Sequence, residues 1–353
     1  MKERKKLEII ECQGTSYEVG KQYGTACKED IRRSAYDLIS NIMKMHQVTR
    51  EDVLHNARKY LPKLEEFDPE GLEFLRGQAE GAGLLFDEVL ALKSRFELGI
   101  YYRSVAGLCT SFAATGTATK DGKTIVGENF DLTVGMPVNL LKIKYQNGLE
   151  QLSLIFGGSC ELTLNSAGIG MALNVMFSPP HEQQLCVPCC SVITRAMRQK
   201  RIGDALGVVC ASGRSILNYL FASAEGDIVG IETRPGDYNV LAPERDILVH
   251  SNHYITDRFK RGDGMFGLME GDSHIRLFRI RRLMERHYGE ITPQVMMTIL
   301  ADHNNYPNSI CAHFNPAMPR GETLASIIMV PADKMMYIAY GQPCSQEYLE
   351  YKL

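Results

Sequence analysis

Apolar residues recur every three or four positions through most of residues 17–104, which is the period of an amphipathic helix. Within that stretch the pattern predicts helices over 17–39, 50–60, 69–83 and 86–97. After residue 108, short runs of apolar and β-branched residues alternate with turn residues, which is typical of strands. The predicted strands cover 124–130, 139–145, 151–157, 168–174, 216–223, 227–233, 247–251, 323–330 and 335–340, and the later helices cover 190–199, 202–211, 275–287 and 293–302.

The change of pattern near residue 108 predicts two regions. Residues 1–108 form a helical segment, and residues 109–353 form a domain built on an antiparallel sheet core. The 353-residue chain has ample material for such a core, because 44% of its residues are hydrophobic. The expected fold class is therefore α+β.

A candidate nucleophile, Cys109, stands at the junction of the two regions. Small and β-prone residues follow it, and a second apolar run after Asp121-Gly122 leads to Asp131, which predicts a β-hairpin with a tight turn. The open ends of an antiparallel pair are neighbours, so we expect the Cys109 thiol and the Asp131 carboxylate to lie together. Each residue also has a structural explanation, because cysteines fill cores and aspartates cap turns at strand ends.

The chemistry that Cys109 offers depends on the bond before it. A cut between Leu108 and Cys109 would give one residue both a thiol nucleophile and an α-amino group. A free thiol with a pKa of about 8.5 is only partly ionised at neutral pH, whereas an α-amino group with a pKa of about 7.7–8.0 can accept its proton there. The precursor could make this cut itself, by attack of the thiol on the Leu108 carbonyl, and Asp131 could then orient the new amine.

The order of motifs along the chain resembles one family. A glycine-containing opening (14–24) is followed by the nucleophile hairpin (109–131), Asn-Ser-Ala-Gly-Ile-Gly (165–170) and Ser-Asn-His (251–253). Three C-terminal motifs come next, at 309–313, 323–327 and 341–344. This order is similar to that of the acyl-coenzyme A:6-aminopenicillanic acid acyltransferase family, the C45 peptidase family of the N-terminal-nucleophile (Ntn) hydrolases. The resemblance implies a four-layer αββα sandwich preceded by a helical pro-segment, with 1–108 as pro-segment and 109–353 as catalytic domain. It also implies an autoproteolytic zymogen that hydrolyses or transfers an acyl group at a linear, non-peptide amide bond through a thioester on Cys109.

The resemblance implies further site residues. Asn252, after the apolar run 247–249, matches the residue that stabilises the oxyanion in the acyltransferase family, and Arg320 stands three residues before Thr323 as an active-site arginine does there. Both also have ordinary explanations, because asparagines close Asx-turns and loop arginines are mostly solvated. Leu108 departs from the family pattern, since several relatives carry glycine before the nucleophile and a bulky residue removes freedom that helps to strain the scissile bond.

Two further asparagines, Asn165 and Asn174, flank the glycine-rich turn 168–170 and look like substrate-pocket positions. Turn chemistry explains them at least as well. His250 and His253 lie beside Asn252, but the Ntn arrangement needs no histidine, so we assign both to local hydrogen bonding.

The sequence predicts no metal and no cofactor. Cys186 and Cys189 have zinc-like spacing but lack a second pair, and Cys311 and His313 are too close in sequence to serve as one. The glycine clusters are too short for a dinucleotide fingerprint or a phosphate-binding loop. The ten cysteines are spread thinly through the chain, so we expect buried free thiols rather than a disulfide framework.

Charge and hydropathy give expectations about partners and location. The formal net charge of −3 offers no attraction to nucleic acid or to an anionic membrane. The basic N-terminus lacks the apolar stretch of a signal peptide, and no window reaches the length of a membrane span, so we expect a cytoplasmic protein. The expected partners are a small-molecule acyl amide or acyl thioester substrate and, after cleavage, the association of the two fragments with each other; a homo-oligomer is left open.

Two alternatives to the Ntn enzyme remain at this level. The first is an unprocessed, non-catalytic relative that binds an acyl or amide ligand, and Leu108 favours it. The second is a papain-like Cys/His/Asn hydrolase, which predicts an active, uncut chain whose activity depends on His253.

Overall fold

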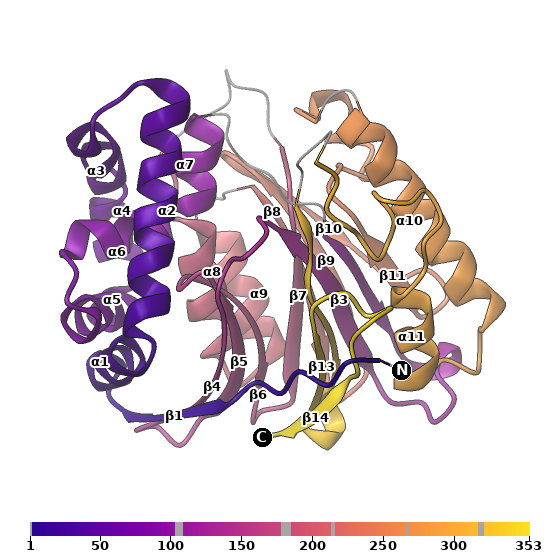
Figure 1. The fold of residues 1–353 in the computed structure, drawn as a ribbon. Coiled ribbons are helices and arrows are strands. Elements are labelled where there is room, and N and C mark those ends of the chain that lie inside the picture. The colour runs from indigo at the N-terminus through magenta and orange to yellow at the C-terminus, as the bar shows by residue number, and fades with distance from the viewer. Residues whose placement is uncertain (1, 103–108, 178–184, 213–215, 266–267, 317–320) are drawn as a thin grey trace.

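The computed structural model describes residues 2–102, 109–177, 185–212, 216–265, 268–316 and 321–353. Two mostly antiparallel sheets face each other across a buried core, and helices cover the outer face of each (Figure 1). The layers therefore run helix, sheet, sheet, helix. The α+β class predicted from the sequence is confirmed.

The first sheet has eight strands in the order β1-β4-β5-β6-β7-β8-β9-β10. Side chains alternate between its faces: Leu140 of β4 points into the core between the sheets, while Leu141 and Ile143 pack against the outer helices. The strands are β1 (Ile9–Gly14), β4 (Val138–Tyr145), β5 (Glu150–Phe156), β6 (Cys160–Asn165), β7 (Ile169–Val175), β8 (Leu217–Ser223), β9 (Ile228–Arg234) and β10 (Asp237–Leu241).

The second sheet has six strands in the order β11-β2-β3-β12-β13-β14. Ala113 and Phe130 face the first sheet, where Phe130 stacks on Phe156 with ring centroids 3.9 Å apart, while Phe112 faces the helices on the other side. The strands are β2 (Thr110–Ala114), β3 (Ile125–Leu132), β11 (Ile247–His250), β12 (Glu322–Val330), β13 (Met335–Tyr340) and β14 (Leu349–Lys352).

Helices from the two ends of the chain cover opposite faces (Figure 1). The N-terminal helices lie on the first sheet, and α10 and α11 lie on the second. The helices are α1 (Ser16–Ala26), α2 (Lys28–His46), α3 (Arg50–Arg58), α4 (Leu61–Phe67), α5 (Pro69–Ala82), α6 (Phe86–Lys93), α7 (Arg95–Tyr101), α8 (Cys189–Met197), α9 (Ile202–Ala211), α10 (Leu268–Arg286) and α11 (Pro293–Leu300).

The predicted helical region at the N-terminus is present, but it also supplies a strand. β1 pairs in parallel with β4, from Ile9 opposite Leu140 to Gly14 opposite Tyr145. Residues 2–102 therefore share a sheet with the rest of the chain as well as a core. The glycines of the opening motif have a packing role: a Cβ at Gly20 would collide with the Phe74 carbonyl of α5, so α1 and α5 approach too closely for a side chain there.

Most of the predicted elements match the observed ones within a few residues, and the differences have local causes. The region predicted as one helix over 17–39 is two helices, α1 and α2, separated at Cys27. The β2–β3 pair is present, but residues 115–124 form a longer connection with a 3₁₀ turn at Gly116–Ala118, so the predicted tight turn is wrong. Among the described residues, no helix is both long and apolar enough to cross a membrane.

Candidate active site

Cys109 lies where the hairpin prediction placed it, immediately before β2 and 1% exposed. β2 and β3 pair in antiparallel register, with Thr110 opposite Asn129. The Cys109 thiol therefore reaches the Asp131 backbone, and its Sγ lies 3.9 Å from the Asp131 carbonyl oxygen. Cys109 and Asp131 are therefore neighbours across the strand pair although they are 22 positions apart, and their contact is through the Asp131 backbone carbonyl.

The surroundings of Cys109 keep its thiol protonated in the uncut chain. Burial raises the thiol pKa well above its ordinary value, and the nearby carboxyl groups of Glu128 and Asp131 raise it further. Glu128 is itself fully buried on β3, and burial raises its pKa as well. The cysteine therefore needs a proton acceptor before it can act as a thiolate.

The Asp131 carboxylate is buried and only half satisfied. Its Oδ1 accepts a hydrogen bond of 2.6 Å from the Thr323 hydroxyl, and its Oδ2 has no hydrogen-bond partner among the described residues. Burial raises the pKa of Asp131 to about 8, although Arg276 and the Thr323 hydrogen bond act in the opposite direction. A new positive charge beside Oδ2 would therefore favour the ionised form and satisfy the free oxygen.

Arg276 of α10 connects the site, and the sequence analysis missed it. Its side chain is 1% exposed, and one guanidinium nitrogen donates to the Cys109 carbonyl oxygen at 2.6 Å and to the Thr110 hydroxyl at 2.8 Å. The other terminal nitrogen donates to Asn252 Oδ1 at 2.9 Å. The available signal was a charged residue on the buried face of α10, one helical turn before Ile280.

Two of the predicted asparagines join this cluster. Asn252 follows β11, and its side-chain amide donates to the Val175 carbonyl at 3.0 Å while its oxygen accepts from Arg276. Asn174 of β7 donates to the Cys109 carbonyl oxygen at 3.2 Å and accepts from Ser111 at 2.6 Å. Both sheets therefore contribute to one buried polar network around the cysteine.

Asn165 does not belong to this network, which corrects the grouping of Asn165 with Asn174. Its amide donates to the Met197 and Gln199 carbonyls at the end of α8, and its oxygen accepts from the Ile169 backbone. Ile169 and Asn174 are five residues apart along β7, or roughly 17 Å at the rise of an extended strand. Asn165 therefore holds a turn and a helix end, as the turn explanation predicts.

The remaining predicted residues divide into two groups. Arg320 and Leu108 lie outside the described residues. His250 and His253 make the local hydrogen bonds expected of them, with Glu232 and Ser251 for the first and with Ser251 and Ser273 for the second. Burial lowers the pKa of His253 to about 3, so this imidazole is neutral.

All ten cysteines are free thiols, and eight are buried, as expected.

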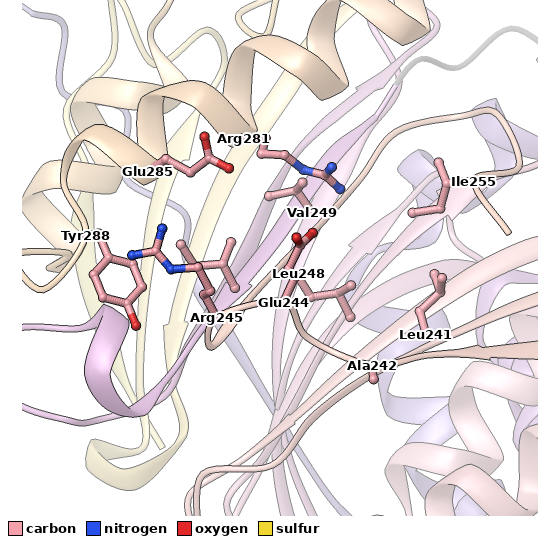
Figure 2. Close-up of a pocket in the computed structure, with 11 residues that line it drawn as sticks. Leu241, Ala242, Glu244, Arg245, Leu248, Val249, Ile255, Arg281, Glu285 and Tyr288 are labelled. Carbon is pink, nitrogen blue, oxygen red and sulfur yellow. The ribbon is translucent and has the colours of Figure 1, made fainter.

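A separate pocket of about 200 Å³ lies between the start of β11 and α10 (Figure 2). Arg245 and Glu244 line one side of it, with the Arg245 guanidinium 4.3 Å from the centre of the Tyr288 ring. Ile247 in its wall pairs with Ala114, at the end of β2 opposite to Cys109. This pocket therefore lies apart from the Cys109 cluster.

Comparisons with known proteins agree with the motif order. The profile of the acyl-coenzyme A:6-aminopenicillanic acid acyl-transferase family matches residues 117–345, which begin after Cys109 and include Asp131, Asn252 and Arg276. The 40 kDa form of acyl-coenzyme A:6-aminopenicillanic-acid-acyltransferase from Emericella nidulans is 24% identical over 345 residues, which cover 95% of this chain and 92% of that protein.

Solved structures with similarity to this chain include two hydrolytic enzymes. A mutant conjugated bile acid hydrolase from Clostridium perfringens has a TM-score of 0.45 and 13% identity, over 69% of this chain and 97% of that one. A penicillin V acylase from Agrobacterium tumefaciens has a TM-score of 0.46 and 12% identity, over 69% and 86%. Because the family profile matches more than half of its length, this chain belongs to the acyl-coenzyme A:6-aminopenicillanic acid acyl-transferase family.

Proposed function

We propose that this chain is a thiol-dependent N-terminal-nucleophile enzyme, an amidohydrolase or acyltransferase that acts on a non-peptide amide bond. The observation that carries the proposal is the position of Cys109 at the head of β2. The Asp131 backbone carbonyl lies 3.9 Å from its sulfur, and Arg276 and Asn174 donate to its carbonyl oxygen. Membership of an acyl-transferase family supports the same chemistry. The thiol itself carries the acyl group, so the reaction needs no cofactor.

In this proposal the chain is a zymogen that cuts itself first. The Cys109 thiol attacks the Leu108 carbonyl carbon, its proton passes to the Cys109 nitrogen as the carbon–nitrogen bond breaks, and the acyl group moves to sulfur as a thioester. Water then hydrolyses the thioester, which leaves a carboxylate on Leu108 and a free thiol and amine on Cys109. The amine is the proton acceptor that the buried thiol lacks before the cut.

Turnover would follow the same bond changes on a substrate amide. The α-amino group takes the thiol proton, the sulfur attacks the substrate carbonyl, and the amine product leaves with that proton. Water or a second amine then attacks the thioester and releases the acyl group. We assign Asp131 to hold the α-amino group through its free oxygen. We assign Asn252 to donate to the oxyanion through the second N–H of its side-chain nitrogen, because the first donates to the Val175 carbonyl. Asn174 and Arg276 position Cys109 through its carbonyl oxygen.

The proposed substrate class is a small acyl amide or acyl thioester. The relative from Emericella nidulans carries acyl-coenzyme A and 6-aminopenicillanic acid in its name, and those groups are properties of that protein. For this chain we propose only the shared chemistry, which is transfer of an acyl group through a thioester. An assay against a panel of acyl amides and acyl thioesters identifies the acyl and amine groups that this chain accepts.

The experiment that tests the proposal is mass spectrometry of the purified full chain. We expect two fragments, the second beginning at Cys109, and a covalent acyl adduct on that fragment after rapid quenching with a cleavable acyl amide. An uncut chain that forms no adduct would contradict the proposed enzymatic function and support the alternative, a non-catalytic protein that binds an acyl or amide ligand. The burial of Cys109 in the uncut chain is the observation that favours this alternative.

Asn252→Ala is expected to lower the rate of acylation by about 10²–10³, because it removes one oxyanion donor. Single-turnover kinetics with a chromogenic acyl amide measure the change. Asn239→Ala on the edge strand β10 is the matched control and should leave the rate unchanged. If the loss follows a large drop in melting temperature, the amide of Asn252 acts as a structural support for Arg276 instead.

The two fragments are expected to stay associated after the cut. β1 remains paired with β4, and α1 and α2 bury Val19, Tyr23 and Ile31 against the first sheet, so dissociation would expose a hydrophobic core to water. Size exclusion of the cut protein should show both fragments at the elution volume of the uncut Cys109→Ala chain. A free N-terminal fragment, with activity retained by the remainder, would refute this expectation.

A further inference from the structure

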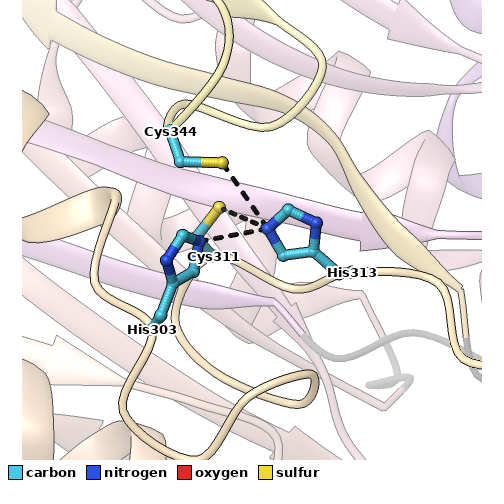
Figure 3. Close-up of side chains that lie close together, drawn as sticks. All are labelled: His303, Cys311, His313 and Cys344. Atoms are coloured by element: carbon cyan, nitrogen blue, oxygen red, sulfur yellow. Dashed lines mark hydrogen bonds between the residues drawn. The ribbon is translucent and has the colours of Figure 1, made fainter.

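Four metal-binding side chains converge at a second place in the molecule, outside the Cys109 network. They are His303, Cys311, His313 and Cys344, and their ligand atoms all lie within 4.8 Å of one another (Figure 3). They come from two separate connections of the fold, the one between α11 and β12 and the one between β13 and β14. Such a meeting of soft and imidazole ligands from distant segments is typical of a built metal site.

The three separations from His313 Nε2 fit a tetrahedral ion. His313 Nε2 lies 3.1 Å from His303 Nε2, 3.6 Å from the Cys311 sulfur and 3.5 Å from the Cys344 sulfur. A tetrahedral zinc with Zn–N bonds of about 2.05 Å and Zn–S bonds of about 2.3 Å places two nitrogens about 3.3 Å apart and a nitrogen and a sulfur about 3.6 Å apart. We propose that these four residues bind one Zn²⁺ ion as a structural site.

Hydrogen bonding alone does not explain this arrangement. The Nε2 atom of an imidazole carries either one hydrogen or one lone pair, so it can make one good hydrogen bond. Here His313 Nε2 faces a second imidazole nitrogen and two sulfur atoms at once. A cation at the centre lets all four ligands direct a lone pair at the same point.

The backbone holds the two central ligands in place. Cys311 and His313 flank Ala312, which forms an isolated β-bridge with Asn308, and side chains two residues apart in an extended segment project to the same side. Ala312 is fixed by two hydrogen bonds with Thr323, one in each direction at 2.9 and 3.1 Å. The sequence analysis expected no site at Cys311 and His313 because they are so close in sequence. In this extended segment the same close spacing lets both side chains bind one ion.

The proposed ion has a structural role, because the protein supplies all four ligands and leaves no open position for substrate. Its ligand segment is nevertheless joined to the active site through Thr323, which accepts a hydrogen bond from the Ala312 backbone and donates one to Asp131. Binding of zinc would fix the connection that positions Thr323. The exposed side chain of His303 provides a route for the ion from solvent.

Metal content of the full chain tests the proposal. Reduced, metal-free protein is loaded with Zn²⁺, exchanged into metal-free buffer and measured by plasma mass spectrometry, and a parallel sample is loaded with Co²⁺. We expect about one Zn²⁺ per chain, and for Co²⁺ the visible bands of a tetrahedral ion with a thiolate charge-transfer band. His303→Ala and Cys344→Ser should each lower zinc affinity by at least about tenfold.

Matched controls come from outside the cluster. His287→Ala removes another exposed histidine and Cys210→Ser another half-buried cysteine, and both variants should keep the zinc of the wild type. Removal of zinc with a chelator should lower the melting temperature of the wild type and of these controls, and should lower that of His303→Ala less.

Three results would overturn the zinc site. The first is reduced protein that retains no zinc after buffer exchange. The second is zinc content that neither His303→Ala nor Cys344→Ser changes. The third is a Cys311–Cys344 disulfide in the protein as isolated, with no zinc bound after its reduction.

Discussion

Cys109→Ala is expected to abolish both chain cleavage and acyl transfer while the protein remains folded. The variant loses the only group on residue 109 that can attack a carbonyl carbon, so neither thioester can form. Removal of one buried sulfur from the head of β2 costs about 1 kcal/mol of the free energy of unfolding, which is small beside the loss of activity. A denaturing gel, an acyl amide assay and a thermal melt measure the three quantities.

The controls for this prediction separate the nucleophile from other thiols. Cys12→Ala removes a buried thiol of β1, far from the site in the fold, and should leave cleavage and activity intact. Cys109→Ser should cut slowly, because a hydroxyl is a weaker nucleophile in the same position. Full acyl amide activity in Cys109→Ala would remove the nucleophile assignment.

The helices and strands that the sequence predicted well are those whose apolar residues follow a clear pattern. β3, β8 and β9 read as short apolar runs between turn residues, and α9 is observed over the predicted range 202–211. Four strands were missed. β1, β10 and β14 are edge strands, whose exposed faces lack the alternation of a buried strand. β6 lies inside the first sheet and is buried along its whole length, so it too lacks a polar face that would mark an alternating strand. Edge pairing depends on the neighbouring strand, which the local pattern does not contain.

The site shows the same division between local and non-local information. The meeting of Cys109 and Asp131 follows from antiparallel pairing, which the hairpin pattern contains. Asn165 and Asn174 are near each other in sequence, yet Asn165 ends β6 and contacts the start of β7, whereas Asn174 lies near the other end of β7, and the two serve different purposes. Arg276 could not be assigned to Cys109 from sequence, because the packing of α10 on the second sheet brings together residues 167 positions apart.

Arg276→Met is expected to lower acyl transfer by about 10²–10³, because it releases both the nucleophile Cys109 and the oxyanion donor Asn252 from their positions. The variant removes the hydrogen bonds that fix the Cys109 carbonyl and the Asn252 amide, and it removes the cation that lowers the pKa of Asp131. Methionine fills much of the same buried volume, which limits the loss of packing. Steady-state kinetics with the acyl amide measure kcat and kcat/KM.

The pH profile distinguishes a positioning role from a structural one. Loss of the positive charge raises the pKa of Asp131 further above its ordinary value, so at a given pH a smaller fraction is ionised to hold the α-amino group. The acid limb of kcat/KM should therefore move to higher pH in Arg276→Met. Arg276→Lys keeps the positive charge but not the two donor nitrogens of the guanidinium. Its acid limb should therefore lie close to that of the wild type, while its rate stays close to that of Arg276→Met.

The control for this experiment is Arg282→Met, which removes an exposed arginine from the same helix and should change neither the rate nor the profile. If Arg276→Met is cut only slowly, the pH dependence of chain cleavage in the purified protein replaces that of turnover, because cleavage uses the same Cys109 thiol, which lies beside the Asp131 backbone. A rate loss without a shift of the acid limb would assign Arg276 to packing alone, and Asp131 would then titrate independently of it.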